Sequence, residues 1–160
     1  MKQRYLIRPV CTGDTESILN LFASVASEGR WIGTETGFDR ERYAEFIRAA
    51  SQDSGSAVAF VCTDNGRPVG QISAHRDPHD ARWDLGMLVL SSHRKQGLGR
   101  ALLAHLIEWA RKQSIDALRL QVFPHNEPAR ALYQAFGFQQ TAHHTKHFVR
   151  SDGERWDVLE

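Results

Sequence analysis

Cysteine is scarce in this sequence and long apolar segments are absent, and each shortage excludes a class of protein. Cys11 and Cys62 are the only cysteines among 160 residues and lack Cys-x-x-Cys spacing, so neither a disulfide framework nor a cysteine zinc site is expected. No run approaches the roughly 20 apolar residues of a membrane span. The N-terminal residues MKQRYLIRPV also lack the apolar segment of a signal peptide. We therefore expect a cytoplasmic protein with no membrane partner.

The sequence also lacks an excess of charge of either sign. Twenty Lys and Arg residues against nineteen Asp and Glu residues leave a formal net charge of +1, whereas nucleic-acid-binding domains usually carry a basic excess. No nucleic-acid partner is therefore expected. A hydrophobic content of 41% argues against disorder, and the length predicts one domain over residues 1–160.

Hydrophobic periodicity predicts seven strands and four helices in the order β-α-α-β-β-β-α-β-α-β-β. The predicted strands are 4–10, 57–62, 69–75, 83–90, 117–123, 138–150 and 154–159. Asp14, Asp39 and Asn126 are the predicted N-terminal caps of three helices, and the remaining helix runs from about residue 98 to Gln113. The pattern favours an α/β (α+β) fold with a mixed, mainly antiparallel central sheet of about seven strands, flanked by four helices.

The most informative segment joins the strand ending near residue 90 to the strongest helix. It contains two glycines, Gly97 and Gly99, and three cations, Arg94, Lys95 and Arg100. The first amides of a helix lack internal partners and the helix dipole adds partial positive charge there. Glycines let the backbone approach an anion closely, so the segment predicts a diphosphate-binding turn. It matches neither the P-loop GxxxxGK[ST] nor the dinucleotide motif GxGxxG.

These residues resemble a known family. Arg94-x-x-Gly97-x-Gly99 is similar to the [QR]-x-x-G-x-[GA] acetyl-CoA signature of the GNAT (GCN5-related) N-acetyltransferases. A second motif of that family stands at Leu120-x-Val122 and continues as Asn126-x-x-Ala129-x-x-Leu132-Tyr133-x-x-x-Gly137-Phe138. The predicted order of elements is also that of the family. The resemblance covers nearly the whole chain, is strongest over 85–138, and implies an N-acetyltransferase with acetyl-CoA as cosubstrate and no metal.

The resemblance implies a role for each matching residue. It places the diphosphate of acetyl-CoA on the turn formed by Arg94, Lys95, Gln96, Gly97, Leu98, Gly99 and Arg100. The pantetheine arm would pair with the backbone of Met87, Leu88 and Val89. An amide of Leu88 or Val89 would then stabilise negative charge on the thioester oxygen. Asn126 is both a predicted helix cap and a candidate cofactor contact.

Three residues are candidates for proton transfer. Tyr133 matches the family's general acid, which protonates the departing thiol, although a packed core tyrosine has the same helical spacing. Asp84 and Glu35 are candidate general bases; the shorter Asp84 stands where many relatives carry Glu. A surface carboxylate is the alternative for each, and no base is needed for an amine of low pKa.

The acceptor is predicted only as a class: a small-molecule or peptide amine, such as an amino acid, a polyamine or a protein N-terminus. Four aromatic side chains are candidates for its pocket: Trp31, Phe38, Trp83 and Trp156. Eight histidines include three on the last long strand, but no third ligand and supporting shell are placed for a metal. The other functional class is a non-catalytic acyl-CoA sensor, which has no use for Tyr133. Monomer and homodimer both stay open.

Overall fold

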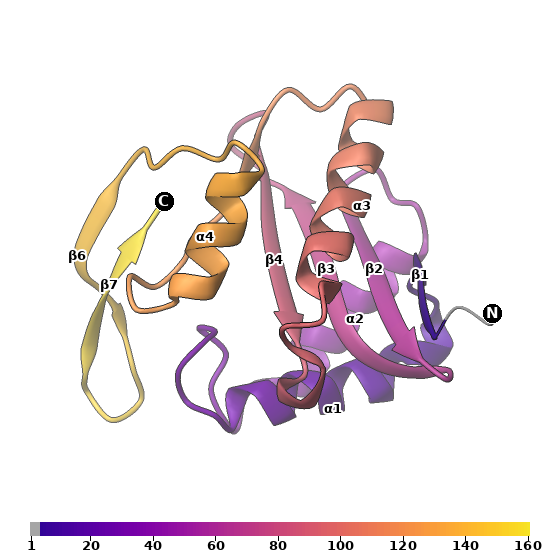
Figure 1. Ribbon diagram of the computed structural model, residues 1–160, viewed down its shortest axis with the longest axis horizontal. Coiled ribbons are helices and arrows are strands. Elements are labelled where there is room, and N and C mark those ends of the chain that lie inside the picture. Colours follow the sequence, from indigo (N-terminus) through magenta and orange to yellow (C-terminus); the bar gives the residue numbers. More distant parts are fainter. Residues whose placement is uncertain (1–3) are drawn as a thin grey trace.

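The computed structural model describes residues 4–160, and Figure 1 shows their arrangement. The order of strands and α-helices along the chain is the predicted one, β-α-α-β-β-β-α-β-α-β-β. The strands are β1 (Tyr5–Pro9), β2 (Ala57–Asp64), β3 (Arg67–Arg76), β4 (Trp83–Val89), β5 (Leu118–Arg119), β6 (His143–Val149) and β7 (Arg155–Leu159). The α-helices are α1 (Thr15–Ala26), α2 (Arg40–Ser51), α3 (Leu98–Lys112) and α4 (Glu127–Ala135).

The main sheet has the order β1-β2-β3-β4-β5, antiparallel except for the parallel β4–β5 pair. β2 and β3 are joined by the predicted Asn65-Gly66 turn, in which both residues have positive φ, 50° and 83°. Such a turn matches the twist of the strands that it connects. The resulting hairpin forms the middle of the sheet.

The helices cover both faces of the sheet. α3 packs on one face, where the fully buried Leu102, Leu103 and Leu106 meet Ile72 of β3. On the other face α1 and α2 bury Ile18, Leu19 and Ile47 against Ala59 and Val61 of β2. In Figure 1 α3 and α4 lie in front of the sheet and α1 and α2 lie behind it.

The prediction of one seven-stranded central sheet is corrected in part. The central sheet has five strands, while β6 and β7 form a separate two-stranded sheet. The predicted strand 117–123 is reduced to Leu118–Arg119, and within residues 4–160 the one bridge toward β7 beyond β5 is the isolated pair Val122–Leu159. β4 and β5 pair over two residues and then separate, which interrupts the ladder that would have made the sheet continuous.

The prediction that the Asp14 side chain caps α1 is wrong. Its carboxylate accepts hydrogen bonds from the Arg8 guanidinium at 2.7 and 2.8 Å and from the Cys11 amide at 2.9 Å. The bond to Arg8 is the main reason why the pKa of Asp14 falls to about 2. Capping by Asp39 and Asn126 is confirmed, since each side chain accepts a bond from an amide of the first turn of its helix.

Candidate active site

The predicted diphosphate turn is built around left-handed backbone. Lys95 and Gly97 have φ values of 60° and 81°. Gly97 is the N-cap of α3, and the first hydrogen bond within the helix runs from Ala101 N to Gly97 O at 3.0 Å. The amides of residues 98–100 therefore lack a partner inside the helix. Neither Lys95 nor Arg100 is paired with a carboxylate within residues 4–160, so both charges are available to an anion.

Gly99 keeps this turn close to its neighbours. A Cβ atom at that position would lie 3.3 Å from Leu132 Cδ2 of α4 and 3.6 Å from Met87 Cε of β4. Contact this tight leaves little room for a side chain. The glycine therefore lets the start of α3 approach both α4 and β4, the two elements that carry the second family motif and the predicted pantetheine edge.

The edge of β4 next to β5 is open over residues 85–89, because β5 pairs only with Trp83 and Asp84. The direction of its backbone groups follows from two bonds: Trp83 N donates toward β5, to Ala117 O, and Leu90 N donates toward β3, to Val69 O. Since successive backbone groups of a strand alternate in direction, the amides of Met87 and Val89 point to the open edge and that of Leu88 points to β3. Of the two predicted oxyanion donors, the register favours Val89.

Arg94 has a different setting from its neighbours in the turn. Its Nε donates to the Val89 carbonyl at 2.9 Å, and its two terminal nitrogens donate to the Glu28 carboxylate at 2.7 and 2.8 Å. All three nitrogens are therefore engaged, and the side chain ties β4 to the end of α1. With its side chain engaged in this way, Arg94 has only backbone groups left for a diphosphate.

Tyr133 lies on α4 and is 8% exposed, with its ring against Phe138. Burial raises the pKa of its phenol to about 12. Asn126 caps the same helix and also donates to the Trp31 carbonyl at 3.4 Å. Helix α4 thus carries the buried Tyr133 side chain on its core-facing side and a contact to the α1–α2 loop at its start.

A cavity of about 250 Å³ adjoins α4. Its walls include Leu118, Leu120, Tyr133, Phe138 and Leu159. Of the predicted site residues only Tyr133 lines this cavity; the turn 94–100, the strand segment 87–89 and Asn126 do not. The cavity is therefore separate from the predicted diphosphate turn, which lies on the surface at the start of α3.

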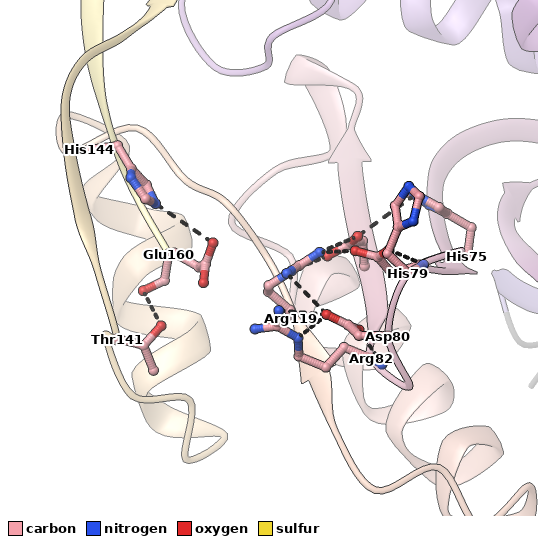
Figure 2. A network of polar contacts seen from close by, with 10 residues as sticks. His75, His79, Asp80, Arg82, Arg119, Thr141, His144 and Glu160 are labelled. Atoms are coloured by element: carbon pink, nitrogen blue, oxygen red, sulfur yellow. Dashed lines mark hydrogen bonds and ion pairs between the residues drawn. The ribbon is translucent and has the colours of Figure 1, made fainter.

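Asp84 and Arg119 form an ion pair at the point where β4 and β5 meet. Both carboxylate oxygens of Asp84 accept hydrogen bonds from Arg119, which also donates to Asp77 at 2.8 Å. Figure 2 shows Arg119 facing Asp80 and Arg82, with His75 and His79 nearby. A guanidinium on both oxygens leaves Asp84 poorly placed to accept a proton, and the pair joins the two strands just before they separate.

Glu35 lies in the loop between α1 and α2, which crosses to the β6–β7 hairpin (Figure 1). Its carboxylate accepts hydrogen bonds from the amide and hydroxyl of Ser151 at 3.0 and 3.1 Å, and Arg150 Nη2 lies 3.2 Å away. Both predicted bases are therefore bound by other side chains. In this structure Glu35 fastens the loop to the hairpin.

An aromatic group lies beside this loop, and among its members only Trp156 is a candidate predicted from the sequence. Phe123, His125, Phe148 and Trp156 contact one another, with ring centroids 4.9 to 6.5 Å apart. His125 Nε2 donates to the Arg30 carbonyl at 2.7 Å. Of the four proposed pocket aromatics only Trp156 belongs to this group. In the sequence, the alternation of Gln121 and Phe123 along the predicted strand indicates that these two side chains lie on the same face.

The other three proposed aromatics lie elsewhere. Trp83 packs against Trp109 of α3, and Phe38 packs against Phe22 and Tyr43. The Trp31 ring contacts two guanidinium groups, with Arg30 Cζ 4.7 Å and Arg94 Cζ 5.8 Å from the ring centroid. In the described part of the chain no cluster of three or more His, Cys, Asp or Glu side chains could hold a metal ion, and none of its helices is long and apolar enough to span a membrane.

Comparison with known proteins agrees with this geometry. Residues 20–138 match the profile of the acetyltransferase (GNAT) family. The chain belongs to the GNAT family. A 110-residue stretch is 39% identical to the [ribosomal protein bS18]-alanine N-acetyltransferase of Escherichia coli K12, covering 69% of this chain and 74% of that protein.

Two solved GNAT structures show the same fold. The ribosomal-protein-alanine N-acetyltransferase of Brucella melitensis superposes with a TM-score of 0.86 at 26% identity, covering 96% of each chain. The yncA protein of Salmonella typhimurium, solved with its cofactor acetyl-CoA, has a TM-score of 0.84 at 22% identity, covering 98% of this chain and 91% of that one. As a GNAT member, the chain is an acetyl-CoA-dependent N-acetyltransferase.

The residues present fit this cosubstrate. Free amides at residues 98–100 and the unpaired Lys95 and Arg100 suit a diphosphate, and the open edge of β4 offers backbone groups for the amides of the pantetheine arm. Neither cysteine belongs to this arrangement: Cys62 is buried in the core, and Cys11 lies beside Asp14 before α1. The site residues therefore suit the binding of a thioester and supply no thiol that could accept the acetyl group.

Proposed function

We propose that the chain transfers the acetyl group of acetyl-CoA directly to a primary amine, with both molecules bound together. The observation that carries the proposal is the arrangement around β4. The start of α3 approaches β4 and α4 at Gly99, beside Met87 and Leu132. Tyr133 of α4 shares a core cluster with Leu98 of α3, and these contacts support the proposal. The α1–α2 loop and the β6–β7 hairpin form the other side of the site, where the amine would bind.

Acetyl-CoA supplies the activated acetyl group as a thioester. The Val89 amide points to the open edge and would donate to the thioester oxygen as negative charge develops there. Tyr133 would donate a hydrogen bond to the departing sulfur, because its raised pKa keeps the phenol protonated throughout the physiological range. Asn126 would hold the start of α4 against the α1–α2 loop.

The proposal assigns no dedicated general base. Asp84 is bound by Arg119, and Glu35 is bound by Ser151. The attacking amine would lose its proton to water before it reacts, so the rate should rise with pH along the amine's own titration. Asp84 would serve instead to hold the two strands together where their separation begins.

The test is a thiol-release assay with acetyl-CoA and a panel of amino acids, polyamines and N-terminal peptides. We expect release of coenzyme A that depends on one class of amine, together with a mass increase of that amine by one acetyl group. A chain that binds acetyl-CoA in a calorimetric titration and acetylates no amine of the panel would instead be an acyl-CoA sensor.

A further inference from the structure

Arg150 stands out from every other polar side chain that the structure describes. Its Nη1 is the single buried side-chain nitrogen or oxygen within residues 4–160 that has no hydrogen-bond partner. The side chain as a whole is only 11% exposed. A buried donor without a partner costs about 1–3 kcal/mol, so such a group in a native protein calls for an explanation, such as a ligand that supplies the missing acceptor.

The surroundings of Arg150 hold its guanidinium in place. The plane lies over the Trp156 ring, with the central carbon 4.1 Å from the ring centroid. The backbone of Arg150 is fixed by the hairpin turn, where its amide donates to Glu154 O at 2.8 Å and its carbonyl accepts from Gly153 N at 3.0 Å. The guanidinium is therefore held in place although its Nη1 has no hydrogen-bond acceptor.

The α1–α2 loop closes over this guanidinium. A Cβ atom at Gly29 would lie 3.6 Å from Arg150 Nη2, and one at Gly33 would lie 3.2 Å from the Phe148 ring. Glu35 Oε1 lies 3.2 Å from Nη2, but the two oxygens of Glu35 receive their hydrogen bonds from Ser151. Arg150 thus has a counter-ion but no bidentate partner.

We propose, building on the proposed function, that Arg150 binds the carboxylate of the acceptor, and that the acceptor is a free amino acid. A planar guanidinium with several unused N–H donors matches a carboxylate, which accepts two parallel bonds. A single carbonyl of a peptide chain would satisfy fewer of them. The acceptor carboxylate accepts hydrogen bonds from the unpartnered Nη1 and from the second N–H of Nη2, while Glu35 keeps its contact with Nη2 and its bonds to Ser151.

The loop contacts favour a small acceptor over a protein N-terminus. The loop is fastened at three points: Glu28 to Arg94, the Arg30 and Trp31 carbonyls to His125 and Asn126, and Glu35 to the hairpin. A polypeptide that continues beyond its first residue would have to leave between these contacts. A free amino acid ends at its carboxylate and requires no exit.

The experiment compares each amino acid with its own amide in the thiol-release assay. We expect kcat/KM for the best amino acid to exceed that for its amide by at least about tenfold, the worth of a charge-assisted hydrogen bond. Arg150→Gln should raise KM for the acid about tenfold or more, leave KM for the amide unchanged and so remove the discrimination. Arg150→Lys keeps the charge but cannot donate two parallel N–H bonds. Its ratio of kcat/KM for acid to kcat/KM for amide should therefore lie between those of the wild type and Arg150→Gln.

Arg155→Gln is the matched control, because Arg155 lies on the same hairpin with an exposed side chain; it should keep the wild-type ratio. Equal preference for acid and amide in the wild type, faster turnover of peptides, or an equal loss for acid and amide in Arg150→Gln would each overturn the proposal. So would a panel in which no free amino acid is acetylated. If no amine of any kind is acetylated, the proposed function fails as well, which separates the two failures.

Discussion

Replacement of Tyr133 by phenylalanine tests how the leaving thiol is stabilised. The change removes one oxygen and keeps the ring that packs against Phe138. The pKa of the phenol is about 12, whereas that of an alkyl thiol is about 8.5. Complete proton transfer from the phenol to the thiolate would therefore be uphill, because the pKa of the phenol lies above that of the thiol. A hydrogen bond from the neutral phenol to the developing thiolate carries no such penalty.

The size of the effect follows from this difference. A hydrogen bond to a charged group contributes about 1.5–3 kcal/mol, so Tyr133→Phe should lower the rate of a single turnover by about 10- to 150-fold. General acid catalysis with full transfer contributes about 10²–10⁴-fold, so a loss above about a thousandfold would contradict the hydrogen-bond reading.

Single-turnover rates across pH, with saturating acetyl-CoA, make the measurement. The affinity for acetyl-CoA should stay within about twofold of the wild type, since the binding turn is intact. Tyr43→Phe removes the same atom from α2, where the hydroxyl contacts Thr34, and serves as the control for loss of a phenol as such. A Tyr133→Phe variant with the wild-type rate at every pH would refute any role of this residue at the sulfur.

Three further predictions concern stability and cofactor binding. Asp14→Asn should lower the free energy of unfolding by about 2 kcal/mol at pH 7. The folded pKa of about 2 lies below the ordinary 3.8, so the stabilisation by Asp14 is present above pH 3.8 and disappears as the pH falls through 2. Urea titrations of both proteins at several pH values would show this. Asp84→Asn should destabilise the chain by about 1–2 kcal/mol, since it leaves a half-buried Arg119 short of a partner, yet the pH–rate profile should keep its shape; loss of the ascending limb would restore Asp84 as the base. Gly97→Ala should weaken acetyl-CoA binding at least about fivefold in calorimetry, because a left-handed conformation costs a residue with a Cβ atom about 1–2 kcal/mol. Gly55 is also left-handed but lies in a distant loop, so Gly55→Ala should leave the affinity for acetyl-CoA unchanged.

The order of the elements and most of their bounds could be predicted from the sequence, because periodicity and turn residues are local signals. The Asn65-Gly66 turn and the caps at Asp39 and Asn126 lie where they were predicted. The separation of β4 from β5 could not be predicted in this way. Alternation continues through residues 117–123, but whether a strand pairs depends on its neighbour, and the neighbour diverges after two residues. Asp14 failed as a cap for a similar reason, since Arg8 on β1 competes for its carboxylate.

The two halves of the proposed site differ in how the sequence encodes them. The proposed cofactor half consists mainly of backbone features within residues 85–100: left-handed conformations at Lys95 and Gly97, a helix start and a strand edge. The acceptor half consists of side chains from three distant segments, as the hydrogen bonds between Glu35 and Ser151, 116 positions apart, illustrate. In the sequence, each of Phe123, Phe148 and Arg150 has the pattern of an ordinary strand residue, and only the fold brings the three segments together. We therefore base the proposed acceptor on the unsatisfied Nη1 of Arg150 rather than on any spacing in the sequence, because this nitrogen is a donor that the folded chain leaves without an acceptor.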